Sequence, residues 1–250
     1  MYDSFAYVYD KFMENVPYDQ WVEYIQALWS HYSLEPQLVL DLACGTGEVT
    51  YRLAEKNYDM IGIDISNEML NVAREKTEKK DLSILFLEQD MREFELYGTV
   101  SSIVCICDGL NYLHDEEDLL QVFSLANNYL DPKGLFIFDM NTAYKYEMLG
   151  QETYTDVQDE CAYIWDNYYD EVEHMNEYHL TIFDKERNGL YRKYEETHYQ
   201  RAYTKERVCQ LLKDAGLQLM AVYDAFTFDE PKENSERLYF IAREKDKEEN

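Results

Sequence analysis

A glycine-rich turn between a buried strand and a helix constrains this chain more than any other stretch. Residues 38–42 (LVLDL) form a short apolar run that is typical of a strand buried on both faces. Gly45 and Gly47 follow in a turn that lets the backbone approach a ligand closely. Residues 48–56 then have helical periodicity. This order predicts the ligand-binding start of a doubly wound parallel sheet.

A second buried strand supports this interpretation. Residues 59–64 (DMIGID) are apolar in the middle and end in Asp64, about 20 residues past the turn. A carboxylate at the tip of the second strand is placed to accept hydrogen bonds from two ribose hydroxyls. We therefore expect a ligand that contains a nucleoside.

The charges around the turn indicate which nucleoside ligand is suitable. A dinucleotide site needs a third glycine in the pattern G-x-G-x-x-G, and Thr50 stands there instead. Asp41 at the strand end and Glu48 at the helix start would repel a pyrophosphate. They suit a ligand with positive charge, such as one that carries an ammonium and a sulfonium group.

Residues 41–47 (DLACGTG) closely match the first motif of the class I S-adenosylmethionine-dependent methyltransferases. The sequence resembles that family, and within it the small-molecule, YqeM-like branch. The resemblance implies S-adenosylmethionine as the cofactor and a strand order of 3-2-1-4-5-7-6, with strand 7 antiparallel. We therefore expect an α/β fold: a doubly wound, seven-stranded Rossmann-like methyltransferase sheet with an antiparallel β insertion after strand 5.

The residue pattern along the chain predicts the remaining organisation. Aromatic residues dominate from about residue 151 to residue 203, where alternation replaces helical periodicity and Asn188-Gly189 is a strong hairpin signal. We interpret this part as three antiparallel strands at 161–169, 173–183 and 190–203. The expected parts of the chain are a helical lid (1–34), a cofactor-binding domain (35–142 and 204–243), a cap (143–203) and a disordered tail (244–250).

The resemblance also implies cofactor contacts. In the family, a carboxylate after strand 3 accepts a hydrogen bond from adenine, an apolar residue after strand 2 packs on the ring, and spaced tyrosines cover the cofactor. Met69, Tyr9 and Tyr18 could equally be ordinary core residues. The expected cofactor-binding residues are Tyr9, Tyr18, Asp41, Ala43, Gly45, Gly47, Asp64, Ile65, Met69, Asp90, Met91, Cys107 and Asp108.

The loop after the fourth strand and the end of the insertion contain the candidates for catalysis. Ligands bind outside the carboxyl ends of parallel strands, so Asp108, Asn111 and Tyr112 should face the transferred methyl group. His198 is the best candidate for a base, because its ordinary pKa of about 6.5 suits neutral pH. Arg201 could orient a carboxylate of the substrate or the cofactor. Both residues could instead be structural strand residues.

The charge of the chain limits its partners. The sequence contains 51 acidic and 23 basic side chains, for a net charge of −28. Such a surface would repel nucleic acids and anionic membranes, and it favours a small-molecule substrate, such as a cationic or amine one. The acidity could instead serve solubility alone. Five scattered cysteines without a C-x-x-C pair argue against disulfides and a metal site.

Together these features predict a cytoplasmic methyltransferase that transfers a methyl group to N or O of a small molecule. It would be a monomer or a homodimer, without a secretory signal or a membrane span. The alternative is a partner-dependent methyltransferase subunit, or a cofactor-binding module, that acts on a protein or RNA. A dehydrogenase that uses a nicotinamide dinucleotide is disfavoured by Thr50.

Overall fold

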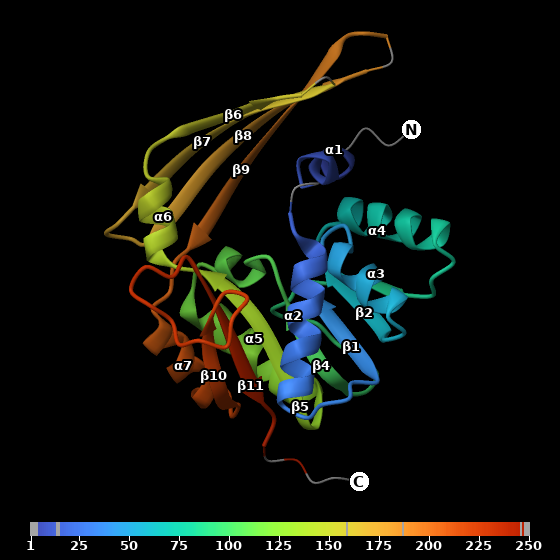
Figure 1. The fold of residues 1–250 in the computed structure, drawn as a ribbon, viewed down its shortest axis with the longest axis vertical. Coiled ribbons are helices and arrows are strands. Elements are labelled where there is room, and N and C mark those ends of the chain that lie inside the picture. Colours follow the sequence, from blue (N-terminus) through green and yellow to red (C-terminus); the bar gives the residue numbers. More distant parts are fainter. Residues whose placement is uncertain (1–4, 14–15, 159, 187, 246, 248–250) are drawn as a thin grey trace.

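The core of the structure is a seven-stranded sheet with helices on both faces, and a four-stranded antiparallel sheet projects from one end (Figure 1). The computed structural model describes residues 5–13, 16–158, 160–186, 188–245 and 247. The predicted fold class, a doubly wound sheet with an antiparallel insertion after its fifth strand, is confirmed.

The seven-stranded sheet has the order β10-β11-β5-β4-β1-β2-β3. Strands β3, β2, β1, β4 and β5 run parallel, whereas β11 is antiparallel to both β5 and β10. This is the predicted order, with the last strand of the chain reversed. The strands are β1 (Leu38–Leu42), β2 (Asp59–Asp64), β3 (Leu85–Glu88), β4 (Val100–Cys105), β5 (Leu130–Asn141), β10 (Gln218–Asp224) and β11 (Arg237–Arg243).

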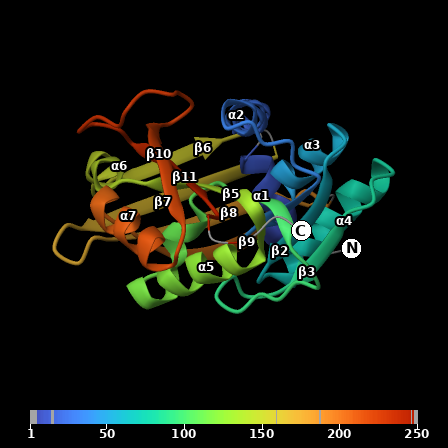
Figure 2. The same ribbon diagram turned by 90° about the horizontal axis from the view of Figure 1, so that it is seen from below.

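Two apolar layers hold the helices against this sheet. Successive side chains of a strand point to opposite faces, so the continuous apolar runs supply both layers. Val39 and Ile137 pack beneath α2 and α3, while Leu40 and Phe138 pack beneath α5 and α7 (Figure 2). The helices are α2 (Tyr18–His31), α3 (Glu48–Glu55), α4 (Asn67–Lys79), α5 (Glu116–Tyr129) and α7 (Lys205–Asp214).

Gly62 in β2 lets the glycine turn and the edge of the sheet pack closely. A methyl group added at Gly62 in β2 would lie 2.7 Å from the ring of Phe86 and 2.9 Å from Cys44 Sγ. The ring of Phe86 therefore lies directly over the strand, where it packs with Leu70 and Ala73 of α4.

The insertion is larger than the sequence predicts. It contains four strands in the order β6-β7-β8-β9 rather than three, preceded by α6 (Ala143–Leu149). The predicted Asn188-Gly189 turn does join β8 to β9. The sequence did not predict β6, because this strand is short and none of its side chains is fully buried. The strands are β6 (Thr153–Val157), β7 (Cys161–Asp170), β8 (Met175–Lys185) and β9 (Tyr191–Arg201).

Hydroxyl side chains cap the starts of helices. Ser66 and Thr204 cap α4 and α7, since their hydroxyls accept from the backbone N–H three residues later. Helix α2 begins at Tyr18, so Asp19 lies in its first turn and Pro17 occupies the cap position. Strand β5 starts at Leu130, directly after α5, so residues 131–134 (DPKG) lie inside the strand.

Described segments near both ends of the chain contact the rest of the molecule. Helix α1 (Phe5–Phe12) lies above α4, on the same side of the molecule as the four-stranded sheet (Figure 1). In the tail, which the sequence predicts to be disordered, Glu244 is buried. Lys247 Nζ donates to the carbonyls of Asn127 and Asn128 near the end of α5, where the helix dipole favours a cation. Residues 1–4, 14–15, 246 and 248–250, which belong to the predicted lid and tail, lie outside the described residues.

No helix in the described part of the chain is both long and apolar enough to span a membrane.

Adding a side chain at Gly62 tests the close packing of β2. We expect Gly62→Ala to lower the free energy of unfolding by about 1–3 kcal/mol, because the new methyl group would overlap the Phe86 ring. Gly98→Ala is the matched control, since a methyl group there would meet nothing within 4 Å. Urea titration measures both changes. Equal stability of the two variants would contradict the packing described here.

Candidate functional site

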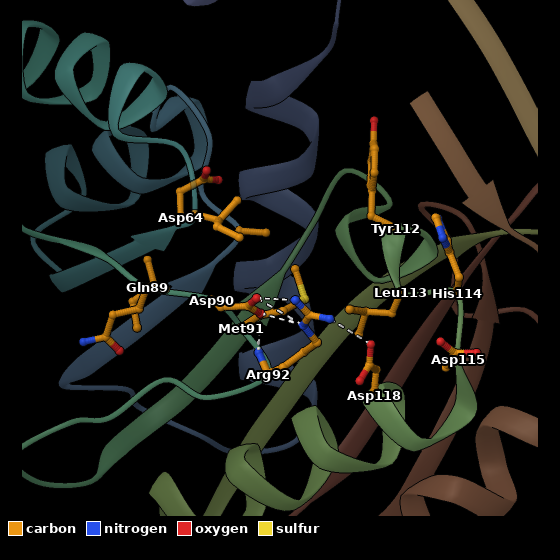
Figure 3. Close-up of a pocket in the computed structure, with 13 residues that line it drawn as sticks. Asp64, Gln89, Asp90, Met91, Arg92, Tyr112, Leu113, His114, Asp115 and Asp118 are labelled. Atoms are coloured by element: carbon orange, nitrogen blue, oxygen red, sulfur yellow. Dashed lines mark hydrogen bonds and ion pairs between the residues drawn. The ribbon is translucent and has the colours of Figure 1, made fainter. Parts of the chain in front are cut away.

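A pocket of about 300 Å³ opens at the carboxyl ends of the parallel strands (Figure 3). Ala43 follows β1, Asp64 ends β2, and Asp90 follows β3. On the opposite wall, the 3₁₀ helix η1 (Gly109–Tyr112) contributes Tyr112, and the loop after it contributes residues 113–115. The lining residues are Ala43, Ile63, Asp64, Ile65, Gln89, Asp90, Met91, Arg92, Tyr112, Leu113, His114, Asp115 and Asp118.

Backbone amides orient the Asp64 carboxylate. Gly45 N–H donates to Oδ2 and Ser66 N–H donates to Oδ1, each at 2.8 Å. Burial raises the pKa of Asp64 above its ordinary value. An ionised carboxylate has about four lone-pair sites, so both oxygens retain capacity for a ligand hydroxyl.

Asp90 and Asp118 share Arg92 at the other end of the pocket. Asp90 accepts hydrogen bonds from the backbone N–H, Nε and Nη2 of Arg92, and these bonds lower its pKa. Arg92 Nη1 also donates to Asp118 Oδ2 at 3.1 Å, which joins the loop after β3 to α5 (Figure 3). The predicted adenine contact at Asp90 is therefore a carboxylate that is already oriented and partly neutralised.

Asp41 lies beneath the glycine turn rather than in the pocket. It is only 3% exposed, and Thr50 Oγ1 donates to Oδ2 at 2.5 Å. Burial raises the pKa of Asp41 to about 7. Thr50, which replaces the third glycine of a dinucleotide motif, thus supports the turn from below.

A tyrosine-rich cluster forms beside the pocket at the end of β4. Burial raises the pKa of Tyr9 in α1, and neighbouring Cys107 and Tyr18 raise it further. Cys107 and Asp108 have φ values of 70° and 53°, a left-handed conformation that costs a non-glycine residue about 1–3 kcal/mol. Asp139 Oδ1 accepts from Asp108 N–H at 2.8 Å and holds this backbone in place.

Arg237, which the sequence analysis did not identify, bridges two buried carboxylates. Its guanidinium donates to Asp108 Oδ1 at 2.7 Å and to Asp139 Oδ2. Burial opposes ionisation of Asp108, but the charges of Arg237 and Lys145 and the hydrogen bonds from Gln200 and Arg237 together outweigh it, so the pKa of Asp108 is lowered. The sequence signal that could have identified Arg237 is its position as a single charged residue at the start of the otherwise apolar residues 237–242.

The four-stranded sheet is tied to the same point. Gln200 Nε2 in β9 donates to Asp108 Oδ2 at 2.6 Å. Tyr146 in α6 donates its hydroxyl proton to Gln200 Oε1 at 2.9 Å. Both side chains are nearly fully buried, so the position of this sheet and the position of Asp108 depend on each other. The alternation of β9 was the signal for Gln200, because it puts this residue on the face of His198.

His198 joins the pocket through Tyr112. Tyr112 Oη lies 2.8 Å from Tyr178 Oη and 3.1 Å from His198 Nδ1. The rings of Tyr178 and His198 are opposite each other on β8 and β9 and stack with centroids 4.8 Å apart. Burial lowers the pKa of His198, so its imidazole stays neutral at a lower pH than that of an exposed histidine.

Two other predicted polar residues have structural contacts. Arg201 lies on the opposite face of β9 from Gln200, where it donates to the His114 carbonyl and packs over the Tyr203 ring. Asn111 is fully buried and donates to the Arg201 carbonyl at 2.8 Å. The structure therefore does not bring Arg201 to the cluster around Asp108.

The predicted site residues form two neighbouring groups. Ala43, Asp64, Ile65, Asp90 and Met91 line the pocket together, with the turn residues Gly45 and Gly47 beside them. Tyr9, Cys107, Asp108 and His198 gather around Tyr112, and Tyr18 lies near Tyr9 and Cys107. Met69 is half-buried in the first turn of α4 and does not line the pocket.

Several known proteins are similar to this chain. A family model described as a methyltransferase domain matches residues 39–134. The YqeM protein of Bacillus subtilis (strain 168), a methyltransferase by name, is 38% identical over 247 residues that cover 97% of each chain. The crystal structure of an S-adenosylmethionine-dependent methyltransferase from Clostridium acetobutylicum ATCC 824 has a TM-score of 0.88 and 29% identity, over 96% of this chain and 98% of that one. The sugar N-methyltransferase KedS8 from Streptoalloteichus sp ATCC 53650 shares the fold, with a TM-score of 0.79 at 18% identity over 98% and 96% of the two chains.

The buried Asp41 gives the protein a specific pH dependence. The folded chain keeps the Asp41 proton up to about pH 7, whereas the unfolded chain releases it near pH 4. We expect the stability of the wild type relative to Asp41→Asn to fall as the pH rises between these values, by up to about 1.4 kcal/mol per pH unit. Urea titrations of both proteins across this range measure the difference. A difference that stays constant with pH would show that Asp41 titrates normally.

Proposed function

We propose that this chain, which belongs to the S-adenosylmethionine-dependent methyltransferase family, transfers a methyl group to N or O of a small molecule. Membership of this family makes the chain an enzyme with S-adenosylmethionine as its cofactor. The contact of Tyr112 with both the pocket and the insertion carries the proposal. The likeness to a sugar N-methyltransferase over nearly its whole length also supports it.

The pocket suits the cofactor in size and chemistry. Its volume of about 300 Å³ is within the range of small-molecule sites. Gly45 has a φ of 54°, and a methyl group added there would meet nothing within 4 Å, so the backbone is open to a ligand. In this proposal Asp64 binds the ribose hydroxyls, Asp90 and Met91 bind the adenine edge, and Ile65 packs on the ring.

The tyrosine cluster beside the pocket is the proposed acceptor site. Bound S-adenosylmethionine supplies an electrophilic methyl group. Residues 1–34 act as a lid, from which Tyr9 and Tyr18 exclude water, and residues 143–203 act as a cap. His198 is the base that removes a proton from the acceptor, and its neutral imidazole is held against Tyr112 and Tyr178. Arg201 has a positioning role in this proposal, because it lies on the other face of β9 from His198 and donates to the His114 carbonyl.

We further propose that the enzyme acts in the cytoplasm, as a monomer or homodimer, without nucleic acid. The net charge of −28 also favours a second candidate, a methyltransferase subunit that needs a basic protein partner. A stoichiometric basic protein in pull-downs from lysate, together with activity only in its presence, would favour this second candidate.

Replacing Asp64 tests the cofactor site. We expect Asp64→Ala to weaken S-adenosylmethionine binding by about 2 kcal/mol or more, about 30-fold, because charge-assisted hydrogen bonds to the ribose are lost. Asp59→Ala is the matched control, since Asp59 is the exposed first residue of the same strand. Calorimetry measures both affinities. Unchanged binding by Asp64→Ala would remove Asp64 from the site.

The pH profile of catalysis tests His198. Because burial lowers the pKa of His198, we expect the fall in kcat/KM that accompanies protonation of the imidazole to lie at a lower pH than for an exposed histidine. In His198→Gln, kcat should drop by about 10²–10³-fold and this acidic limb should disappear. His179→Gln is the control, because His179 lies on the exposed face of β8. A profile that keeps the same acidic limb without His198 would rule out its role as the base.

A further inference from the structure

We propose that the methyl acceptor is a small amine that binds as an ammonium cation and carries no phosphate or carboxylate group. This inference rests on the proposed function. It concerns the charge of the acceptor, which the similarity to other methyltransferases leaves open.

The two arginines of the site are each held between two carboxylates. Arg92 lies between Asp90 and Asp118 at the pocket. Arg237 lies between Asp108 and Asp139 beside it. Each group of three side chains carries a net charge of −1 when ionised, so neither guanidinium is available to neutralise an anionic acceptor.

The contacts beneath the lid repeat this pattern. Lys76 pairs with Asp10 of α1 at 2.6 Å and with Glu48. Arg52 pairs with Asp19 of α2 at 2.9 Å and with the same Glu48. Two cations therefore meet three carboxylates here, and an anion entering from the lid side would have to compete with all three.

Lys145 and Arg201, two further cations among the described residues near the cluster, have other contacts. Lys145 donates to Asn141 Oδ1 at 2.9 Å, and burial lowers its pKa. Arg201 points to the outer face of the cap, as described above. Burial thus disfavours the charge of Lys145, and the hydrogen bond to the His114 carbonyl directs the Arg201 guanidinium, so neither cation is a strong receptor for a phosphate or carboxylate of the acceptor.

Glu196 on the inner side of the cap has no ion pair with the arginines and lysines that the structure describes. Glu196 lies two residues from His198 and on the same face of β9. Burial raises the pKa of Glu196, and the negative charge of Glu68 in α4 raises it further. An ammonium group in this region would stabilise both carboxylates, whereas an anion would be repelled.

Aromatic rings on the same face suit a cation as well. Tyr178 stacks on His198 and meets Trp165 of β7 edge-to-face at 5.6 Å. Tyr112 approaches His198 edge-to-face at 5.8 Å. Electron-rich ring faces attract ammonium groups, most strongly where water is excluded. The rings and the excess carboxylates thus favour the same kind of acceptor.

Three probes of the same ring and similar size test the proposal: benzylamine, benzyl alcohol and benzoate. They are titrated by calorimetry into the protein saturated with S-adenosylhomocysteine, so no methyl transfer takes place. We expect benzylamine to bind about tenfold more tightly than benzyl alcohol, and benzoate to bind most weakly. Benzylamine that binds no more tightly than benzoate, or not at all, would overturn the proposal.

Three variants locate the binding. Tyr178→Leu should abolish the preference for benzylamine over benzyl alcohol, whereas Tyr178→Phe should keep it because the ring face remains. Tyr199→Leu should leave it unchanged, since Tyr199 is exposed on the outer face of the same sheet. A preference that survives in Tyr178→Leu would contradict the site assigned here. Failure of the proposed function would appear separately, as no binding of S-adenosylhomocysteine before any probe is added.

Discussion

The bridge between Arg237 and its two carboxylates is the interaction on which the geometry of the site depends. Asp108 follows β4, Asp139 lies in β5, and Arg237 begins β11, so one guanidinium joins three neighbouring strands. Asp139 is fully buried, and a buried carboxylate without a partner typically costs about 3–5 kcal/mol. The antiparallel pairing of β11 with β5, which brings Arg237 opposite Asn141, therefore also positions Asp108.

The cap extends this dependence into the acceptor side. Gln200 reaches Asp108 only because β9 returns to the sheet beside η1, and the buried Tyr146 holds the other end of the Gln200 amide. The same strand carries His198 two residues earlier. The strand that carries the proposed base is thus positioned by a chain of buried polar contacts through Asp108, Gln200 and Tyr146.

The sequence predicted most of the features that depend on short stretches of chain. The glycine turn around Gly45 and Gly47, the terminal carboxylate Asp64 and the hairpin turn at Asn188-Gly189 are local patterns, because each is set by the backbone within a few residues. The strand order followed from the family resemblance that these patterns support. Five of the proposed cofactor contacts accordingly meet in one pocket.

Contacts between distant residues could not be predicted in this way. The partners of Arg237 lie about 100 residues or more away in sequence, and no local pattern links them. Strand β6 and helix α6 were missed because few of their side chains are buried. The side of the strand on which Arg201 lies could have been predicted. Arg201 is three positions from His198, and strand alternation puts residues at that spacing on opposite faces.

The place of the cap in the chain has a consequence for how this architecture can change. The whole insertion leaves the sheet after β5 and returns before α7, and β5 still pairs with β11 along its length. The entropy of closing such a loop grows slowly, by about 0.6 kcal/mol for each doubling of its length. A cap of another size could therefore replace this one at little cost to the sheet, provided that it preserved a partner for Asp108. The two halves of the reaction, cofactor binding and acceptor selection, can in that sense evolve as separable modules.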